Sequence, residues 1–505
     1  MPRRLQRVLI ANRGEIAVRI LRTLREEGRT SIAIFSEPDR TALHVLMSDE
    51  AYLVGPGPSR ESYLNMDRVL ETAKRVKADA IHPGYGFFAE NETFARRCAE
   101  EGIVFIGPSP ATIAALGDKL MAREAAVRAG VPIIPGSPGP VSSLDEVKGF
   151  AKTIGYPLML KAAAGGGGKG MRVVRSDAEL EGAWDMTRGE AGAAFGDDRV
   201  FVERYIERPR HVEAQILADH TGRVAFLGER ECSVQRRHQK LLEETPSPAF
   251  DAATRKAFGE AACRVAKEVG YLSAGTVEFI LDEQNRFYFL EVNTRLQVEH
   301  PVTEMVTGLD LVSEQIRVAE GRELSFGDAT PEPRGWAMEA RIIAEDPTRN
   351  FMPSAGTVER LLFAHGPGVR NDAGIYRGYD VPVFYDSLLS KLVVWGSDRD
   401  QARRRMLRAL GEMVLDGPHH NVAFHQWLCA HPEFAAGNLS TRFLEEHFTP
   451  QSLAPSEEAM DVAVMAAAMH AHAESLRVAV APADGAGGGE ARSTWKWAGR
   501  GRSGR

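Results

Sequence analysis

The sequence has 505 residues, which suggests roughly two to four domains rather than a single core. Its 44% hydrophobic and 26% charged residues are typical of a soluble globular protein, and a formal charge of −7 excludes a general attraction to nucleic acid or to anionic membranes. The four cysteines form no CxxC pair and no apolar run reaches roughly 18 residues, so we expect a cytoplasmic protein with neither a zinc site nor a membrane span.

The first 120 residues alternate short apolar runs with helical stretches. The run RVLIA is followed by a helical stretch that ends at Gly28, and TSIAIF, EAYLV, ADAIHPG and IVFIG repeat the strand signal. This alternation predicts an open parallel sheet, whose ligands lie beyond the carboxyl ends of the strands. The first turn carries one glycine, Gly14, and lacks GxGxxG, so no nicotinamide cofactor is expected there.

Three further units are predicted after this one. A helix around 117–130 leads through the connector VPIIPGSPGP into a strand-rich unit over 121–330, which ends with a helix near 251–270 and the strand pair TVEFILD and RFYFLEVN. A third unit over 331–448 mixes strands with a helix. Residues 449–505 form an Ala-rich helix and a basic tail expected to be flexible.

The stretch KAAAGGGGKGMRVV, residues 161–174, contains four consecutive glycines. Gly168 and Lys169 are followed by Gly170 rather than Ser or Thr, which excludes a Walker loop, and a strand after the glycines excludes a dinucleotide fingerprint. A hairpin tip with bare backbone N–H groups remains. It fits either a phosphate-binding lid or an ordinary mobile loop, and the stretch alone favours neither.

The stretch FLEVNTRLQVEHPVTE places polar residues at alternate positions. If the chain is extended here, all of them point to one face of a strand, and their number would be costly in an ordinary core. A solvated strand face is an equally good explanation of the spacing alone. The residues concerned are Glu291, Asn293, Arg295, Gln297 and Glu299.

The preceding strand supports a site. A symmetric hairpin about residues 284 and 285 would set Glu278 directly opposite Glu291, where like charges repel. A cation between them explains the pair best, and oxygen ligands with an Asn amide nearby suit Mg²⁺ that bridges nucleotide phosphates.

Two weaker motifs complete the set. HPGYGF at 82–87 is explained by turn chemistry alone. ECSVQRRHQKLLEE gathers Arg236, Arg237, His238 and Lys240, which form either a solvated face or a set of donors for phosphate or bicarbonate oxygens.

Together these motifs closely resemble the biotin carboxylase family of the ATP-grasp superfamily. The likeness runs from about residue 5 to residue 447 and is most specific in IANRGEIAVRI, AIHPGYGFFAEN, FIGPSP, KAAAGGGGKGMRVVR, ERPRHVEAQILAD, ERECSVQRRHQK and EVNTRLQVEHPVTEM. It implies an α/β and α+β architecture with a Rossmann-like N-terminal domain over 1–120, an ATP-grasp domain over 121–330 with a lid at 131–204, and a C-terminal domain over 331–448.

The resemblance also implies roles for individual residues. The implied ATP-binding residues are Lys119, Lys161, Gly165, Gly166, Gly167, Gly168, Glu203, His211, Gln235, His238, Glu278 and Glu291. Glu278, Glu291 and Asn293 would hold Mg²⁺ or Mn²⁺. Bicarbonate would lie against Lys240, Arg295, Gln297 and Val298, and biotin near Tyr85 and Arg341. The implied catalytic set is Lys240, Arg295, Arg341 and the base Glu299.

The chain departs from the family pattern at the lid and beside the adenine site. Ala163 and Ala164 stand where a glycine and a serine are common, which puts the rate of lid closure in doubt, and Arg204 replaces a common lysine. No AMKM-like biotinylation tetrapeptide occurs, so we expect biotin on a separate carrier protein, with carboxyltransferase subunits as further partners and a homodimer as in the family.

The final acceptor is expected to be acetyl-CoA, with propionyl-CoA (or another acyl-CoA) and pyruvate as alternatives. Another ATP-grasp ligase is disfavoured because ERECSVQRRHQK and EVNTRLQVEHPVTE match the biotin branch. An inactive nucleotide-binding subunit is disfavoured because every expected carboxylate is present.

Overall fold

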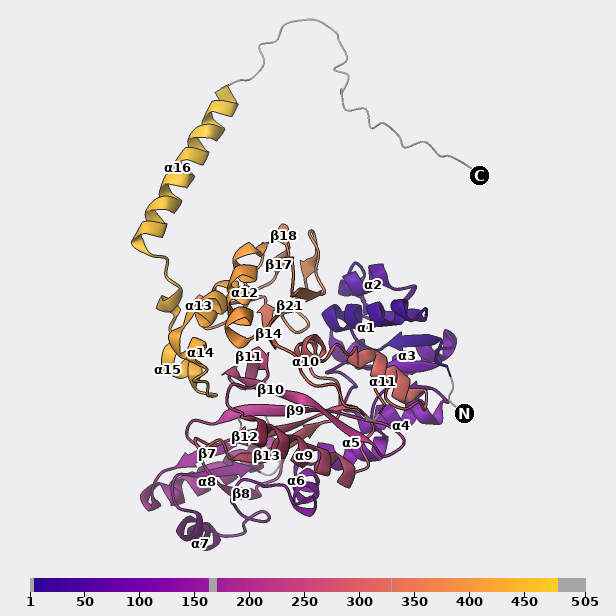
Figure 1. Cartoon of the computed structure of the whole chain (residues 1–505), viewed down its shortest axis with the longest axis vertical. Helices are drawn as coiled ribbons and strands as arrows, with labels where there is room; N and C mark the ends of the chain where they lie inside the picture. Colours follow the sequence, from indigo (N-terminus) through magenta and orange to yellow (C-terminus); the bar gives the residue numbers. More distant parts are fainter. Residues whose placement is uncertain (1–3, 163–169, 328, 480–505) are drawn as a thin grey trace, which may run out of the picture. The chain divides into compact units, whose positions relative to one another are not determined.

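The computed structural model describes residues 4–162, 170–327 and 329–479. Within the described residues the chain divides into a compact unit over Met1–Leu453 and a second unit over Ala454–Arg505. Figure 1 shows both units along the chain.

The N-terminal region forms the predicted five-stranded parallel sheet, with strand order β3-β2-β1-β4-β5. Apolar strands alternate with amphipathic helices, as parallel crossovers require. The strands are β1 (Arg7–Ile10), β2 (Thr30–Ser36), β3 (Glu50–Gly55), β4 (Ala80–His82) and β5 (Val104–Phe105), and the helices are α1 (Gly14–Glu26), α2 (Leu43–Met47), α3 (Met66–Arg75), α4 (Glu92–Glu100) and α5 (Pro110–Gly117).

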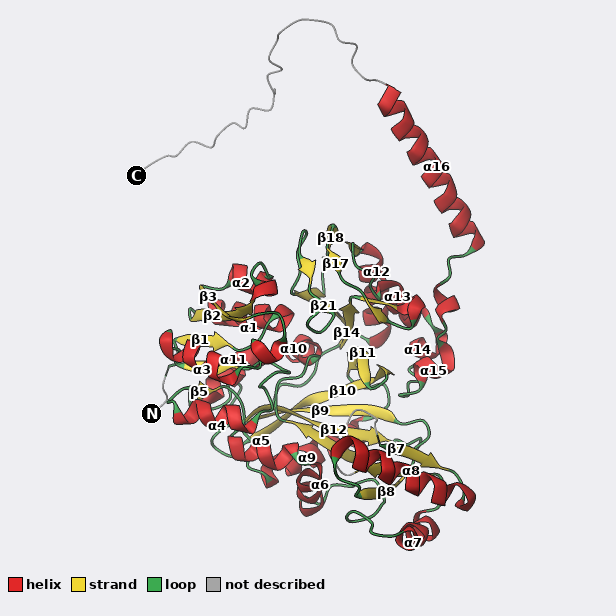
Figure 2. Cartoon of the chain, turned by 180° about the vertical axis from the view of Figure 1, so that it is seen from behind, coloured by secondary structure: helices red, strands yellow, loops and turns green. Residues whose placement is uncertain are grey.

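An eight-stranded antiparallel sheet has the order β13-β12-β9-β10-β11-β14-β21-β19. Strand β11 pairs with β14, so one sheet continues across residue 330, where the sequence predicts a domain boundary. Figure 2 shows α9 (Ala252–Glu268) and α6 (Lys119–Arg128) beside its long strands. The strands are β9 (Arg210–Ala218), β10 (Val224–Arg236), β11 (Gln239–Thr245), β12 (Ser273–Leu281), β13 (Phe287–Asn293), β14 (Trp336–Ile343), β19 (Val369–Ala373) and β21 (Leu388–Gly396).

A separate three-stranded sheet carries the glycine-rich stretch. Strand β6 (Leu158–Ala162) pairs antiparallel with β7 (Met171–Val174) and β8 (Val200–Arg204), which confirms the predicted hairpin on both sides of the glycines. Helices α7 (Leu144–Ile154) and α8 (Asp177–Phe195) belong to the same region, whose core contains Leu158, Leu160 and Trp184. The glycines themselves lie outside the described residues.

The Met1–Leu453 unit also contains six further helices and six short strands within the described residues. The helices are α10 (His300–Thr307), α11 (Leu311–Ala319), α12 (Arg399–Glu412), α13 (Val422–Ala430), α14 (Pro432–Ala436) and α15 (Phe443–His447), and the short strands are β15 (Glu345–Asp346), β16 (Met352–Pro353), β17 (Gly356–Thr357), β18 (Arg360–Leu362), β20 (Asp380–Val381) and β22 (Val414–Asp416). Single 3₁₀ turns lie at Glu37–Asp39, Ser59–Glu61, Pro347–Arg349 and Pro450–Leu453.

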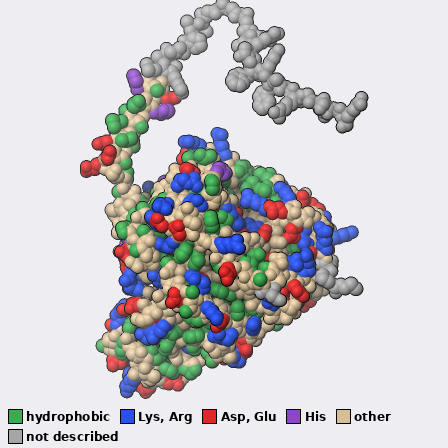
Figure 3. Space-filling model, viewed as in Figure 1, with side chains coloured by type: hydrophobic (Ala, Val, Ile, Leu, Met, Phe, Trp, Pro, Cys, Tyr) green, Lys and Arg blue, Asp and Glu red, His purple; other side chains and the backbone are tan. Residues whose placement is uncertain are grey.

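The predicted Ala-rich helix is α16 (Glu457–Ala479), the described part of the second unit. The basic tail beyond it lies outside the described residues. No helix in the described ranges is both long and apolar enough to cross a bilayer. On the face drawn in Figure 3, acidic and basic side chains of Met1–Leu453 are interspersed.

Candidate active site

A cavity of about 1840 Å³ lies in the Met1–Leu453 unit and gathers most of the predicted site residues. Its walls come from α6, the three-stranded sheet, the strands β9 to β13, and β14. The predicted residues that line it are Lys119, Lys161, Glu203, His211, Gln235, His238, Lys240, Glu278, Glu291, Asn293, Arg295, Gln297, Val298 and Arg341. The two ends of the cavity differ in chemistry.

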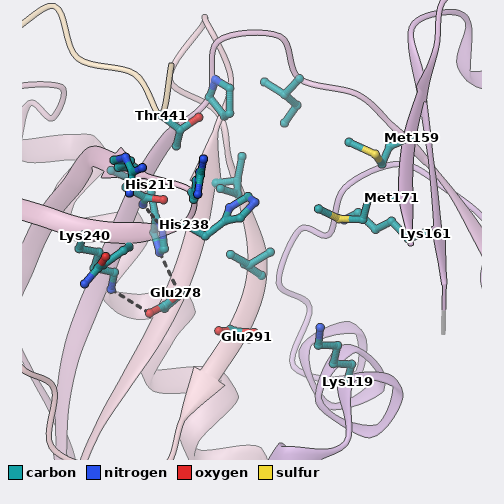
Figure 4. A pocket seen from close by; sticks show the side chains of 18 of the residues that line it. Lys119, Met159, Lys161, Met171, His211, His238, Lys240, Glu278, Glu291 and Thr441 are labelled. Carbon is teal, nitrogen blue, oxygen red and sulfur yellow. Dashed lines mark hydrogen bonds and ion pairs between the residues drawn. The ribbon is translucent and has the colours of Figure 1, made fainter. Parts of the chain in front are cut away.

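One end carries the predicted nucleotide lysines. Lys119 begins α6, and Lys161 stands on β6 across the cavity from the His211 and Lys240 wall (Figure 4). Lys161 forms an ion pair with Glu203 of β8, and Arg123 Nη1 of α6 lies 2.6 Å from the other oxygen of that carboxylate. Glu203 therefore pairs with two cations at the nucleotide end of the cavity.

The predicted ribose and base contacts lie on β9 and β10. The amide of Gln235 lies 2.7 Å from His211 Nδ1 and donates to the carbonyl of Cys232 at 2.8 Å. His211 Nε2 is 2.8 Å from Glu278. Burial alone would lower the pKa of His211, but Glu278 overrides it and raises that pKa. His238 lies in the tight turn between β10 and β11. Its φ of 66° is in the left-handed region, which is uncommon for residues other than glycine.

The predicted carboxylate pair is confirmed. Strands β12 and β13 pair with Glu278 directly opposite Glu291. Protein groups already surround Glu278: it accepts from Lys240 Nζ at 3.0 Å and from Asn293 Nδ2 at 2.8 Å, and its other oxygen lies 2.8 Å from His211 Nε2. Those cations outweigh burial and lower its pKa, whereas burial and the facing Glu278 raise the pKa of Glu291.

This donor set fits a divalent cation. Glu278 is already paired with Lys240 and His211, but burial and the facing Glu278 raise the pKa of Glu291. A hard cation with oxygen ligands would offset the charge of Glu291 at this position. Glu278, Glu291 and Asn293 are therefore the residues that could hold Mg²⁺ or Mn²⁺.

At the other end Lys240 is surrounded by carboxylates. Its Nζ lies 2.5 Å from Glu213, 3.0 Å from Glu278 and 2.7 Å from Glu299 (Figure 4 shows its contact with Glu278). Behind it the fully buried Arg230 donates to Glu213 at 2.6 Å. Three carboxylates raise the pKa of Lys240 well above its usual value, although burial acts in the opposite direction.

Glu299 is fully buried at the start of α10 between two cations. Its carboxylate meets Lys240 at 2.7 Å and Arg341 Nη2 at 2.9 Å, and Arg341 Nε also donates to Glu243 at 2.6 Å. Burial would raise the pKa of Glu299, but Lys240 and Arg341 hold it well below its usual range. The carboxylate is thus ionised, and an anion that competes for its two cations would make it a stronger base.

The alternating segment converges on the cavity in a different way from the prediction. The strand ends at Asn293, and residues 294–299 turn rather than continue extended, so the expected single strand face is wrong beyond Asn293. The polar groups still meet, because Arg295 donates to Gln297 at 3.0 Å and to Asn293 at 3.2 Å. Arg295 also donates to Glu90 of the N-terminal region at 2.9 Å.

Tyr85 does not line the cavity. Its hydroxyl donates to Glu15 of α1, and its ring packs at the edge of the core formed by α1 and α11. Arg341, the other predicted biotin residue, does line the cavity. The predicted lid residues Gly165, Gly166, Gly167 and Gly168, with Ala163 and Ala164, lie outside the described residues.

Sequence reasoning missed several charged residues of the site, among them Glu90, Arg123, Glu213, Arg230 and Glu243. Glu213 sits on β9 between the buried residues His211 and Gln215, and the alternation rule applied to 291–299 would have found it in RHVEAQ. Arg123 and Glu90 act through partners 80 and 205 residues away, and no local pattern signals such contacts.

Family models match three consecutive stretches of the chain. Residues 4–113 match the biotin carboxylase N-terminal domain, residues 118–326 the ATP-binding domain of the carbamoyl-phosphate synthase L chain, and residues 339–446 the biotin carboxylase C-terminal domain. The chain belongs to the biotin carboxylase family. It is accordingly an ATP-dependent carboxylating ligase, and the predicted architecture of N-terminal, ATP-grasp and C-terminal domains is confirmed. The domain boundaries at 120, 330 and 448 stay predictions.

Individual relatives cover nearly the whole compact unit. Biotin carboxylase 1 of Bacillus subtilis is 52% identical over 444 residues, which is 88% of this chain and 99% of the relative. A pyruvate carboxylase subunit of Methanothermobacter thermautotrophicus is 49% identical over 442 residues, 87% of this chain and 90% of the relative.

A solved structure of this biotin carboxylase fold includes ligands. The biotin carboxylase domain dimer of Hydrogenobacter thermophilus 2-oxoglutarate carboxylase, in complex with MgADP, ADP and bicarbonate, has a TM-score of 0.83 and 46% sequence identity. The match covers 90% of this chain and 100% of that one.

Proposed function

We propose that the protein uses ATP and bicarbonate to carboxylate biotin on a separate biotin carboxyl carrier protein. The observation that carries this proposal is one cavity with two chemically distinct ends. Cations and a facing carboxylate pair suited to Mg²⁺–ATP line one end, and Lys240 and Arg341 line the other. Glu299 does not itself line the cavity, but it is buried in contact with both Lys240 and Arg341.

The nucleotide would lie across the first end. Lys119 and Lys161 would neutralise phosphate oxygens, and Glu203, His211, Gln235 and His238 would line the base and ribose. The lid role that the family resemblance implies for Gly165–Gly168 falls outside the described residues. Glu278, Glu291 and Asn293 would hold Mg²⁺ or Mn²⁺, and a cation bound there would supply positive charge beside the phosphates. Support comes from the 2-oxoglutarate carboxylase structure, whose ligands include MgADP.

Bicarbonate would lie at the second end. Arg295, Gln297, Lys240 and the backbone of Val298 bind the anion, and Glu299 accepts its proton. The deprotonated oxygen attacks the γ-phosphorus of ATP, the bond to ADP breaks, and carboxyphosphate forms. Carboxyphosphate would then break into CO₂ and phosphate within the cavity.

Biotin would react at the same end. Phosphate accepts the proton of the ureido nitrogen, Arg341 stabilises the oxygen that gains negative charge, and the nitrogen forms a bond to CO₂. Tyr85 is assigned to the biotin side of the site, although its hydroxyl is turned toward Glu15.

The acceptor and the partners complete the proposal. We assign acetyl-CoA as the final acceptor, with a carboxyltransferase as the partner in fatty acid synthesis, a homodimer as the working assembly and the cytoplasm as its location. Near-complete coverage of a relative named simply biotin carboxylase supports this choice. Pyruvate is the second candidate, because a pyruvate carboxylase subunit is nearly as similar.

ATP hydrolysis tests the proposal directly. The purified chain should release phosphate from ATP only when bicarbonate and free biotin are both present, and Arg295→Ala or Glu299→Gln should abolish that release. Arg286→Ala changes an exposed arginine of the same hairpin and serves as the matched control. Hydrolysis that needs an amine instead of biotin would identify another ATP-grasp ligase, and ATP binding without turnover would identify an inactive subunit.

A further inference from the structure

Lys391 is a fully buried lysine behind the bicarbonate end of the cavity, and the mechanism above does not use it. It stands in the middle of β21, where its backbone pairs with Arg341 of β14 on one side and Asp372 of β19 on the other. Directly paired residues point to the same face of a sheet. Lys391 and Arg341 therefore project together toward α10, whose Val302 packs against Val393 of the same face.

The ammonium of Lys391 contacts three segments of the chain. It donates to the carbonyl of Val298 at 2.9 Å, lies 3.1 Å from Glu15 Oε2 of α1, and stands 5.8 Å from the centre of the Tyr85 ring. The hydroxyl of Tyr85 in turn donates to Glu15. Two residues assigned to substrates, Val298 and Tyr85, are thus fixed through one buried cation.

These contacts are costly to maintain. Burying an ammonium costs several kcal/mol unless a carboxylate and hydrogen-bond acceptors compensate for lost water. An apolar side chain would fill the same space at lower cost, but it would hold neither the Val298 carbonyl nor Glu15. Burial also raises the pKa of Glu15 to about 7, even though Lys391 opposes that shift.

We propose that Lys391 is a positioning residue that ties the bicarbonate cradle to the biotin side of the site. It holds the Val298 peptide on one side and the Glu15–Tyr85 pair on the other, so that the two substrates meet in a fixed relation. This inference rests on the proposed roles of Val298 and Tyr85.

A purely structural role would be to neutralise Glu15. The variant Lys391→Met leaves Glu15 buried without its cation, and a loss of activity would then be ambiguous. The double variant Lys391→Met/Glu15→Gln removes both charges, keeps an acceptor for Tyr85, and separates the two roles.

The experiment compares wild type, Lys391→Met, Lys391→Met/Glu15→Gln and Lys391→Arg by thermal unfolding and by KM for each substrate. Lys391→Met should unfold at a lower temperature and raise KM for bicarbonate and for free biotin on the order of tenfold, with KM for ATP within about twofold. The double variant should regain most of the Tm but keep both raised KM values. Lys391→Arg should recover part of the affinity because it keeps a donor for Val298.

Each outcome decides the inference. A double variant that regains wild-type KM values with its Tm overturns it, as do equal rises in all three KM values. If Lys391→Met does not fold, the double variant and Lys391→Arg still give the comparison. Wild-type protein without turnover that depends on bicarbonate and biotin would instead overturn the proposed function itself.

Discussion

The bicarbonate end and the nucleotide end of the cavity are organised differently. Around Lys240 the charges are buried and already paired, with the side chain of Glu299 at 0% exposure and that of Lys240 at 11%. Around Glu203 the groups are more open, with the side chain of Lys161 at 28% exposure. The bicarbonate end is built on the continuous eight-stranded sheet, whereas the nucleotide end adds α6 and the small three-stranded sheet to strands of that same sheet.

This difference has a physical consequence. Fixed charges in a buried site act on a developing negative charge without reorganising, which favours placing the chemistry at the bicarbonate end. At the nucleotide end Lys161 must exchange Glu203 for phosphate, so this end is suited to a ligand that enters and leaves. Substitutions at the bicarbonate end should therefore reduce turnover, and substitutions at the nucleotide end should change ATP affinity.

Lys240→Met should have the largest effect. It leaves Glu213, Glu278 and Glu299 without the cation they share, and it removes a donor from the bicarbonate site. We expect biotin-dependent turnover to fall roughly a hundredfold to a thousandfold. Steady-state phosphate release measures it.

The control for Lys240→Met is Lys152→Met, which changes an exposed lysine of α7. Circular dichroism should show both variants folded. A Lys240→Met enzyme with turnover within a few-fold of wild type would contradict the distinction between the two ends.

His425→Gln tests how far the bicarbonate end rests on buried neutral groups. The ring of His425 lies 2.9 Å from the carbonyl of Arg341, and burial lowers its pKa from 6.5 to about 4. Between these values the unfolded chain binds more protons than the folded one, so stability is lost as the pH falls from about 6.5 to about 4. This histidine alone accounts for about 3 kcal/mol of that loss.

Urea unfolding at pH 7.5 and pH 4.5 measures this effect. His425→Gln should show a smaller drop in midpoint between the two values than wild type, whereas His365→Gln, which changes an exposed histidine, should show the same drop. Equal drops in wild type and His425→Gln would mean that His425 is not held neutral.

Arg123→Leu tests the nucleotide end. Without Arg123, Glu203 keeps Lys161 as its remaining partner of the two. Lys161 then leaves Glu203 for a phosphate group less readily. We expect KM for ATP to rise about fivefold with kcat nearly unchanged. Arg128→Leu, on the same helix but paired with Glu268, is the matched control. A fall in kcat without a change in KM would contradict the assignment.

Much of the site could be predicted from local patterns. A symmetric turn about residues 284 and 285 predicts the Glu278–Glu291 pair, and the pair is present. The strands nearest the turn, however, pair about residue 284, with Leu281 opposite Phe287, and an irregularity between Glu278 and Phe279 brings Glu278 opposite Glu291. The glycine stretch could be placed on a hairpin because strands border it on both sides. The expected extended strand is wrong beyond Asn293, yet Arg295 still contacts Gln297 and Asn293, whereas Glu299 contacts Lys240 and Arg341 instead.

What could not be predicted depends on contacts between distant elements. Nothing near Glu90 indicates that Arg295 reaches it, and nothing in the sequence joins β11 to β14 across residue 330. Lys391 stands in the apolar strand LLSKLVVWG, where the pattern alone indicates a core strand with two polar residues, Ser390 and Lys391. Its proposed role depends on two contacts that only the fold provides: β21 pairs Lys391 with Arg341 of β14, and the ammonium of Lys391 donates to the carbonyl of Val298.

Truncation after Leu453 should have the smallest effect. All the described site residues lie in the Met1–Leu453 unit, and α16 belongs to the other unit. Both ends of the cavity should therefore keep their properties, with kcat, KM for ATP and KM for bicarbonate within about twofold of the full chain. Steady-state kinetics of the two chains with free biotin measures this. A change in KM for ATP alone, or in KM for bicarbonate alone, would show that the C-terminal unit contributes to that end of the cavity.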